Sequence, residues 1–277
     1  MKKKILVPID FSTCSQKALE QAVGLGKKLD AQLIVLHACQ KAVPYADSSA
    51  GAFSRALILE EERKAKSAYE RVKTTLKELG QVKHDFLIKH AYPQDAIISH
   101  TLMENIDLIV MGTTGAGGFK GLLFGSNTYS VIKNVKCPVL AIPMESEVRE
   151  YFKSIVLASG YKSKVRKRTF NILIEIAKAS SAELHILHVS EAMAKKTAKT
   201  QEAQKLERYF KNLKYSFHFK MGNNINDGIS EYVKENSIDL LTLVGNEQGL
   251  LDRIFTQSMS TTMANHSKNP FLILPSR

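Results

Sequence analysis

NIDLIVMG, residues 105 to 112, decides the fold, because a second version of it, SIDLLTLVG, occurs at residues 237 to 245. In both copies an aspartate precedes a run of mainly apolar residues, and a glycine ends the run. Short apolar runs bounded by turn residues are typical of buried parallel strands. The chain therefore carries the same predicted strand twice.

Three further pairs of stretches repeat in the same order. Self-similarity at long period predicts a tandem duplication. The seam falls in ESEVREY at 145–151, which predicts domains at 1–146 and 147–277. The other pairs are KKILVPIDFS at 3–12 with FKSIVLASGYK at 152–162, AQLIVLHAC at 31–39 with AELHILHVS at 182–190, and NVKCPVLAIP at 134–143 with HSKNPFLILP at 266–275.

Strands and helices alternate in the first half. Apolar residues at helical spacing follow Ser12, a suitable N-cap, and other amphipathic stretches separate the apolar runs. Strict alternation predicts an α/β fold: two tandem five-stranded parallel-sheet domains with helices on both faces. The predicted strands are 5–9, 33–38, 83–90, 107–112 and 137–143, and the predicted helices are 15–29, 60–80, 93–105 and 126–134.

Composition places the chain among globular proteins. Of its 277 residues, 44% are hydrophobic and 24% charged, and the formal net charge is +12. The densest basic run, KSKVRKR at 162–168, has no interleaved aromatic residues or recognition-helix signature. These runs favour solvated helix faces over a nucleic-acid surface.

Cysteine usage and the N-terminus indicate a cytoplasmic protein. Cys14, Cys39 and Cys137 are odd in number and widely spaced, which favours buried, reduced thiols. MKKKILVPID has too few apolar residues for a signal peptide, and no run approaches the roughly 18 residues of a membrane span. We expect neither a membrane partner nor a disulfide framework.

The glycine-rich stretch MGTTGAGGFKGLLFGSN, residues 111–127, follows a strand at its carboxyl end, where parallel sheets bind ligands. Glycines allow positive φ and a close approach of backbone N–H groups, which form anion-binding nests. Ser126 or Asn127 can cap the next helix, whose free N–H groups suit a phosphate. No lysine follows Gly125, which excludes a Walker-type loop, and the dinucleotide fingerprint belongs after the first strand.

Gly112, Gly115, Gly125 and Ser126 match G-2x-G-9x-G-[ST], the pattern of the ATP-binding branch of the universal stress proteins. VPIDFS at 7–12, the LHA strand end and CPVLAIP also resemble that family, so the resemblance covers the whole chain. It implies a Rossmann-like fold, similar to the adenine nucleotide alpha-hydrolases, and a bound ATP with a divalent cation such as Mg²⁺.

The resemblance also implies a set of site residues. The aspartate of the VP-x-D segment lies beside adenine and ribose in ATP-binding relatives, and the residue after the histidine of the second strand lines the adenine pocket. The loop holds ribose and phosphates. The expected nucleotide-binding residues are Pro8, Asp10, Ala38, Met111, Gly112, Thr114, Gly115, Gly125, Ser126 and Asn127.

Structural alternatives accompany these assignments. Asp10 can instead cap the following helix, and the glycine loop can stay unoccupied. Lys120 can meet a phosphate or remain solvated. For the remaining candidates a structural role is favoured: turn chemistry for Asp107 and Asp239, and satisfied core histidines rather than metal ligands for His37 and His188.

The second half departs from the motif. Aligned without gaps, Gly160 replaces the aspartate, Val244 and Glu247 replace the first two glycines, and Gln257 replaces the third, while Ser258 keeps its place. A local shift recovers Gly245 as a first glycine but not the third. We predict one nucleotide site per chain, and fifth strands, VLAIP and FLILP, that meet edge to edge within the chain.

Three functions remain open. The first is a stress-response protein that binds ATP and acts as a regulator or protector, in which ATP orders the 112–126 loop and the 40–60 insertion for an unknown protein partner. The second is a nucleotide-independent scaffold or dimerisation module, and a homodimer fits both. The third is a relative of the adenylating enzymes or electron-transfer flavoproteins, but the sequence lacks the S-G-G-x-D-S and H-I-G-H motifs of such proteins. No nucleophile or base constellation marks an enzyme, although relatives suggest slow ATP hydrolysis or autophosphorylation.

Overall fold

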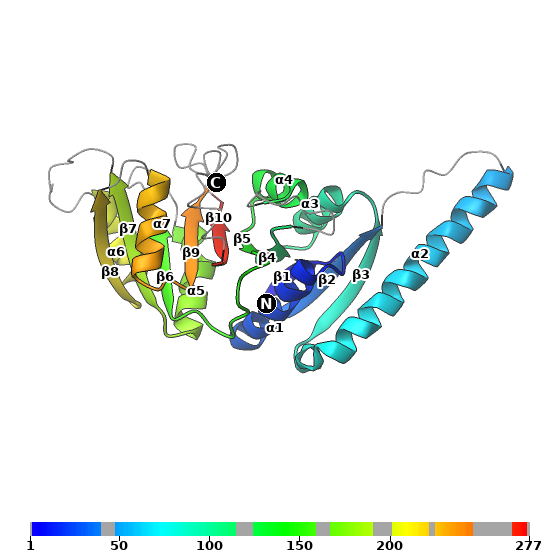
Figure 1. The fold of residues 1–277 in the computed structure, drawn as a ribbon, viewed down its shortest axis with the longest axis horizontal. Coiled ribbons are helices and arrows are strands. Elements are labelled where there is room, and N and C mark those ends of the chain that lie inside the picture. Colours follow the sequence, from blue (N-terminus) through cyan, green and yellow to red (C-terminus); the bar gives the residue numbers. More distant parts are fainter. Residues whose placement is uncertain are drawn as a thin grey trace.

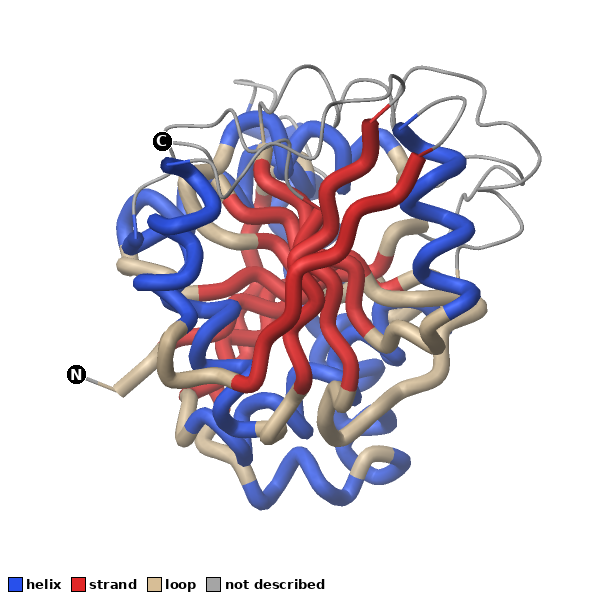
Figure 2. The backbone as a smooth tube through the Cα atoms, turned by 90° about the vertical axis from the view of Figure 1, so that its left-hand side faces the viewer, coloured by secondary structure: helices blue, strands red, loops and turns tan. Residues whose placement is uncertain are grey.

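The computed structural model describes residues 2–39, 48–114, 124–158, 167–190, 201–221, 225–245 and 268–275 of the chain. All strands in these ranges join one ten-stranded sheet in the order β3-β2-β1-β4-β5-β10-β9-β6-β7-β8. Helices cover the sheet (Figure 1), and the view in Figure 2 shows the twist of the strands at its centre. None of the described helices combines the length and apolar content needed to cross a bilayer.

The first half alternates strands and helices as predicted. Its strands pair in parallel in the order β3-β2-β1-β4-β5, so the strand order reverses at β1 and β4. The predicted N-cap Ser12 is confirmed, since its side chain accepts from the Ser15 N–H. The elements are β1 (Lys4–Pro8), α1 (Thr13–Leu29), β2 (Gln32–Cys39), α2 (Ser48–Thr75), a 3₁₀ turn (Lys77–Gln81), β3 (His84–His90), α3 (Pro93–Met103), β4 (Leu108–Gly112), α4 (Ser126–Asn134) and β5 (Val139–Ile142).

Helix α2 corrects two predictions. It begins at Ser48, so residues 48–60 of the expected insertion are helical. It ends at Thr75 instead of the predicted Gly80, which lies in the 3₁₀ turn that follows the helix. The hydroxyls of Thr74 and Thr75 both donate to the carbonyl of Arg71, which weakens helix continuation. In Figure 1 the N-terminal part of α2 projects beyond β3.

The second half repeats the order of the first. Its strands run β10-β9-β6-β7-β8, all in parallel. Strand β10 pairs antiparallel with β5, which confirms that the fifth strands meet within the chain. The elements are β6 (Ser154–Ala158), a 3₁₀ turn (Lys167–Phe170), α5 (Asn171–Ala179), β7 (Glu183–Ser190), α6 (Gln201–Phe210), β8 (Lys214–Met221), α7 (Ile225–Glu235), β9 (Leu240–Val244) and β10 (Phe271–Leu274).

The core is continuous across the join. One apolar layer holds residues of α1, α2, α5 and α6 with one face of the sheet, and the other holds residues of α3, α4 and α7 with the opposite face. Helices α1 and α5 pack against each other. On the opposite face the ring of Phe124, at the end of the glycine loop, meets Phe271 of β10 edge-on at 5.4 Å. Each half therefore buries apolar surface of the other.

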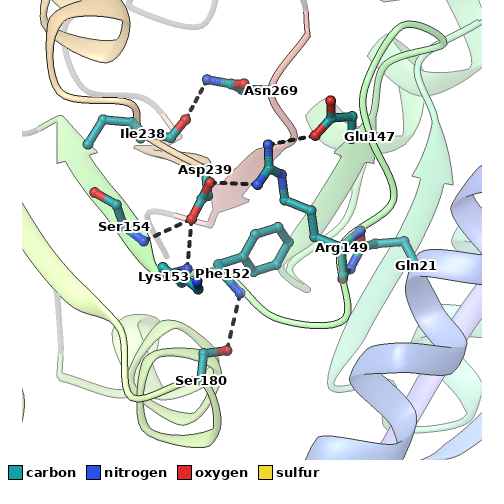
Figure 3. Close-up of polar contacts among 10 residues, drawn as sticks. All are labelled: Gln21, Glu147, Arg149, Phe152, Lys153, Ser154, Ser180, Ile238, Asp239 and Asn269. Atoms are coloured by element: carbon teal, nitrogen blue, oxygen red, sulfur yellow. Dashed lines mark hydrogen bonds and ion pairs between the residues drawn. The ribbon is translucent and has the colours of Figure 1, made fainter.

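Residues 144–153 form a strap that ties the halves together (Figure 3). The buried amide of Gln21 donates to the Arg149 carbonyl (2.6 Å) and accepts from the Arg149 N–H (3.0 Å). The Arg149 guanidinium lies 3.1 Å from Oδ1 of Asp239, at the start of β9. Helix α1 of the first half is thus linked to the second half through one arginine.

Candidate functional site

The candidate site lies where the sheet changes strand order. Strand β1 pairs with β2 on one side and with β4 on the other, so the carboxyl ends of β1 and β4 are neighbours. Pro8 ends β1, Asp10 follows it, and Gly112 ends β4. In open parallel sheets this is the position at which ligands bind.

Gly112 is required by a close approach. A Cβ at this position would lie 2.8 Å from Sγ of Cys14 and 3.1 Å from its carbonyl carbon. Cys14 is buried in the first turn of α1, and its thiol donates to the Ile142 carbonyl at 3.4 Å. The glycine therefore lets the end of β4 touch the start of α1. Close approach, rather than a positive φ, is therefore what requires glycine here.

Gly125 is the N-cap of α4, which corrects the expectation that Ser126 or Asn127 caps the helix. Those residues occupy the first two helical positions. Gly125 has φ −69° and ψ 164°, an ordinary extended conformation, and a Cβ would lie 3.3 Å from the Thr113 carbonyl oxygen. Because glycine has no side chain, the N-cap residue itself supplies no side-chain hydrogen bond to the first turn. The N–H groups there lack acceptors within the helix and carry the positive end of its dipole.

Two threonines that the sequence reading missed hold this helix end against β4. The Gly125 N–H donates to the Thr113 carbonyl at 2.6 Å, and the Thr113 N–H donates to the Ile142 carbonyl at 2.9 Å. The Thr128 hydroxyl donates to the Gly112 carbonyl at 2.9 Å. Both threonine side chains are buried. The sequence signal was a hydroxyl residue in the first turn of the predicted helix, which can reach back to a preceding strand.

Residues 115–123 lie outside the described part of the chain, and with them the predicted Gly115 and Lys120. Thr114 precedes that segment and is partly buried. Phe124 follows it, with an exposed fraction of 7%. The two ends of the loop are therefore fixed, at β4 by Thr113 and at α4 by Gly125.

Asp10 supports the N-cap of α1 and is not itself the cap. Its Oδ1 accepts from the Ser12 N–H at 3.0 Å and from the Ser12 hydroxyl at 2.5 Å. The Ser12 hydroxyl oxygen in turn accepts from the Ser15 N–H in the first turn of α1. Asp10 is exposed, and Phe11 beside it has φ 63°, a region that a bulky residue rarely adopts. This turn presents the carboxylate at the carboxyl edge of the sheet.

The remaining predicted residues sit on the same edge at different depths. Ala38 is partly buried near the end of β2, and Met111 is in the core with an exposed fraction of 5%. His37 has the structural role expected of it, since its Nδ1 lies 2.7 Å from the Ile9 carbonyl and its ring packs on Phe11 at 4.8 Å.

The aspartates before the fourth strands have the predicted structural role in both halves. Oδ2 of Asp107 accepts from the Lys4 N–H at 2.9 Å. Oδ2 of Asp239 accepts from the N–H groups of Lys153 (2.8 Å) and Ser154 (3.1 Å). Each aspartate fixes the start of the first strand of its half.

The three cysteines are free and buried, as predicted. Burial raises the pKa of the Cys39 thiol, and the neighbouring Glu61 and Glu62 carboxylates raise it further. Burial also raises the pKa of Cys137. These two cysteines are therefore protonated thiols at neutral pH, which makes them poor nucleophiles.

The equivalent edge of the second half is described only in part. Val244 ends β9 where Gly112 ends β4, and it is buried in the core. Gly245 donates its N–H to the Leu274 carbonyl at 2.7 Å. Gly160, Glu247, Gln257 and Ser258 lie outside the described residues. The prediction of a single nucleotide site therefore remains a prediction from sequence.

Comparisons of the sequence with family profiles and with known proteins agree on one family. The sequence profile of the universal stress protein family matches residues 1–143 and again 152–275. Universal stress protein MJ0531 of Methanocaldococcus jannaschii is 32% identical over 141 residues, which cover 50% of this chain and 81% of that protein. YxiE of Bacillus subtilis is 32% identical over 148 residues, which cover 51% of this chain and 99% of that protein.

Solved structures also match this chain over both halves. A universal stress protein from Archaeoglobus fulgidus covers 99% of this chain and 98% of its own, with a TM-score of 0.74 and 23% identity. At this identity the likeness concerns the fold.

Proposed function

This chain belongs to the universal stress protein family, and we propose that its first half, residues 1–146, binds ATP and acts as a nucleotide-dependent regulator or protector. The observation that carries the proposal is the glycine-capped N-terminus of α4, fixed at the carboxyl end of β4. A helix N-terminus whose N-cap residue has no side chain, at a strand-order reversal, is suited to a phosphate group.

The proposed contacts follow the chemistry of each position. The N–H groups of Ser126 and Asn127 flank the phosphate position, whereas that of Gly125 already donates to the Thr113 carbonyl. The Ser126 hydroxyl can donate to a phosphate oxygen. Asp10 offers carboxylate oxygens to ribose or adenine donors from the end of β1. Ala38, Pro8 and Met111 supply apolar surface, and a divalent cation such as Mg²⁺ would accompany the phosphates. Residues 147–277 act as a packing partner without a nucleotide of their own.

A scaffold function is the second candidate, because the motif residues also have structural roles. Gly112 fits against Cys14, and Asp10 holds Ser12. Either contact would keep these residues in place without a nucleotide. In this case both halves are structural, and a homodimer would form through surfaces other than the β5–β10 pair.

Calorimetric titration of the full chain with ATP, cyclic AMP and GTP separates the two candidates. Asp and Asn both cap helices well, so Gly125→Asp and Gly125→Asn preserve α4 while filling its N-terminus. Only aspartate adds a negative charge beside the phosphates. We expect ATP to bind the wild type, and Gly125→Asp to weaken it by about tenfold or more, and more than Gly125→Asn does.

The matched control is Gln257→Asp at the equivalent position of the second half, which should leave ATP affinity unchanged. Absence of ATP binding, or equal binding by Gly125→Asp, supports the scaffold. Limited proteolysis with and without ATP tests the regulatory part of the proposal, since identical cleavage between residues 112 and 126 would contradict ordering of the loop.

A further inference from the structure

The second half contains a cluster of polar rings under α7. His185 on β7 and His218 on β8 stack with ring centroids 4.9 Å apart and planes inclined by 16°. Nδ1 of His185 lies 2.8 Å from the hydroxyl of Tyr232 on α7, and its Nε2 lies 3.4 Å from the hydroxyl of Ser154 on β6. Nε2 of His218 lies 2.7 Å from the hydroxyl of Ser216. The cluster links three strands to one helix.

The first half has no such cluster at the equivalent positions. The strand registers place Ile34 where His185 stands and Leu87 where His218 stands. The first-half equivalent of Tyr232 is His100, since each lies at the same distance in sequence before the aspartate of the fourth strand, Asp239 or Asp107. Ile34 belongs to the apolar layer under α3, and Leu87 packs against it. The two histidines therefore replace apolar packing that this fold can accommodate, which calls for a reason specific to the second half.

We propose that the His185–His218 stack is a proton-responsive lock, which holds α7 on the sheet at neutral pH and loosens it on acidification. The proposal concerns the second half and is independent of nucleotide binding in the first.

The hydrogen bonds of His185 explain why acidification should loosen α7 and not tighten it. In a neutral imidazole one ring nitrogen donates and the other accepts, whereas both donate in the protonated ring. Neutral His185 therefore accepts from the hydroxyl of Tyr232 or of Ser154. Protonation removes that acceptor, so one of these hydroxyl hydrogens loses its partner. Tyr232 is buried, with an exposed fraction of 6%, where an unpaired hydroxyl is costly.

The surrounding charges give the pH range. On β7 the Glu183 carboxylate, paired with Lys214 of β8 at 2.8 Å, favours the charged form of both imidazoles, whereas Lys214 opposes it at His185. Burial is the larger effect and lowers the pKa of both histidines, and the charge of His218 lowers that of His185 further. On the helix side, Tyr232 has its pKa raised by burial to about 12 and stays neutral. The lock therefore responds below the ordinary histidine pKa of about 6.5.

A second contact holds the same helix through Lys220, whose ammonium group stays charged in this range. Nζ of Lys220 on β8 lies 3.3 Å from Glu231 and 2.7 Å from Glu235, both on α7. Burial lowers the pKa of Lys220, but the hydrogen bonds and charges of the two carboxylates together outweigh burial and raise the pKa. These ion pairs keep α7 attached when the stack is protonated, so acidification loosens the helix without detaching it.

Hydrogen exchange of the full chain, followed by mass spectrometry at pH 7.5 and 5.5 and referred to intrinsic rates at each pH, tests the lock. We expect protection of the 225–235 segment to fall roughly tenfold at pH 5.5, the effect of one lost buried hydrogen bond. The double variant His185→Ile, His218→Leu installs the residues of the first half and should abolish the fall. His100→Gln, in the first half, should leave it intact.

Equal protection of 225–235 at both pH values in the wild type overturns the proposal, as does an unchanged fall in the double variant. Should that variant not fold, proton–carbon NMR of the wild-type histidines decides instead. A coupled pair that titrates below pH 6.5 together with shifts in α7 supports the lock. Independent titration of the two rings near pH 6.5, or titration without any change in α7, overturns it.

Discussion

Thr242 and its first-half equivalent, Val110, differ by a single buried hydroxyl group. Thr242 lies in the middle of β9 with no exposed surface, and its hydroxyl has no hydrogen-bond partner among the described residues. Val110 has the same position in β4 and is equally buried. The two side chains have the same shape, so the difference between them is one unpaired hydroxyl.

Thr242→Val should stabilise the chain, because it removes a buried polar group that has no partner. We expect the free energy of unfolding to rise by about 1 kcal/mol, measured by urea unfolding at neutral pH. The reciprocal Val110→Thr should lower it by a similar amount. A loss of stability in Thr242→Val would show that the hydroxyl is paired in solution.

Individual residues of the candidate site show how much of it the sequence could predict. The spacing of the glycines located the ends of the loop correctly, but the reason given for them was incomplete. At Gly112 the cause is the thiol and backbone of Cys14, a residue that is distant in sequence and reaches this point only through the packing of α1 on β4. The roles of Thr113 and Thr128 were missed for the same reason, since their acceptors are carbonyls of neighbouring elements.

At the level of elements, the equivalent aspartates Asp107 and Asp239 provide a matched pair. Both accept backbone N–H groups at the start of a strand, but only Asp239 also contacts Arg149 of the strap. The Asp239 side chain is 12% exposed and that of Arg149 is 41% exposed. The ion pair is therefore partly screened by water, and its contribution is modest.

Asp239→Asn should lower the free energy of unfolding by about 1 kcal/mol more than Asp107→Asn, because asparagine keeps an acceptor oxygen at both sites but loses the ion pair at one. Denaturant unfolding of both variants measures the difference. Arg149→Ala in each background isolates the pair, since the coupling should appear only with Asp239. Equal effects of the two asparagine variants would mean that the strap adds no stability through this contact.

Elements with a clear period were predicted well, and those that depend on context were not. The bounds of α4 and β3 agree with the predicted ranges 126–134 and 83–90 to within one residue. The first turns of α2 were assigned to an insertion, because SSAGAFSRALIL has serines and a glycine where a loop is expected. Alanine and leucine in this stretch are strong helix formers, and they extend the helix back to Ser48.

At the level of the whole molecule, the repeat predicted both the sheet and the pairing of the fifth strands. The packing of α1 on α5 joins equivalent helices of the two halves, as the β5–β10 pair joins equivalent strands, but it was not predicted. The contact of Phe124 with Phe271 and the strap at Arg149 could not be read from the repeat, because each joins elements that are not equivalent. Together these contacts make the second half part of the support of the candidate site. The end of the glycine loop packs directly on β10.

This continuity predicts that the two halves unfold together. Since both apolar layers cross the β5–β10 join, separating the halves would expose buried residues such as Leu140 and Leu272, and a half-folded chain should be scarcely populated. Hydrogen exchange at increasing guanidinium concentration should therefore show the same midpoint for strand β2 in the first half and β7 in the second. The N-terminal turns of α2 serve as the internal control, because exposed residues such as Leu59 should exchange by local fraying at low denaturant. Two separate midpoints for β2 and β7 would show that the tandem halves are independent folding units, and that the second half does not stabilise the proposed nucleotide site.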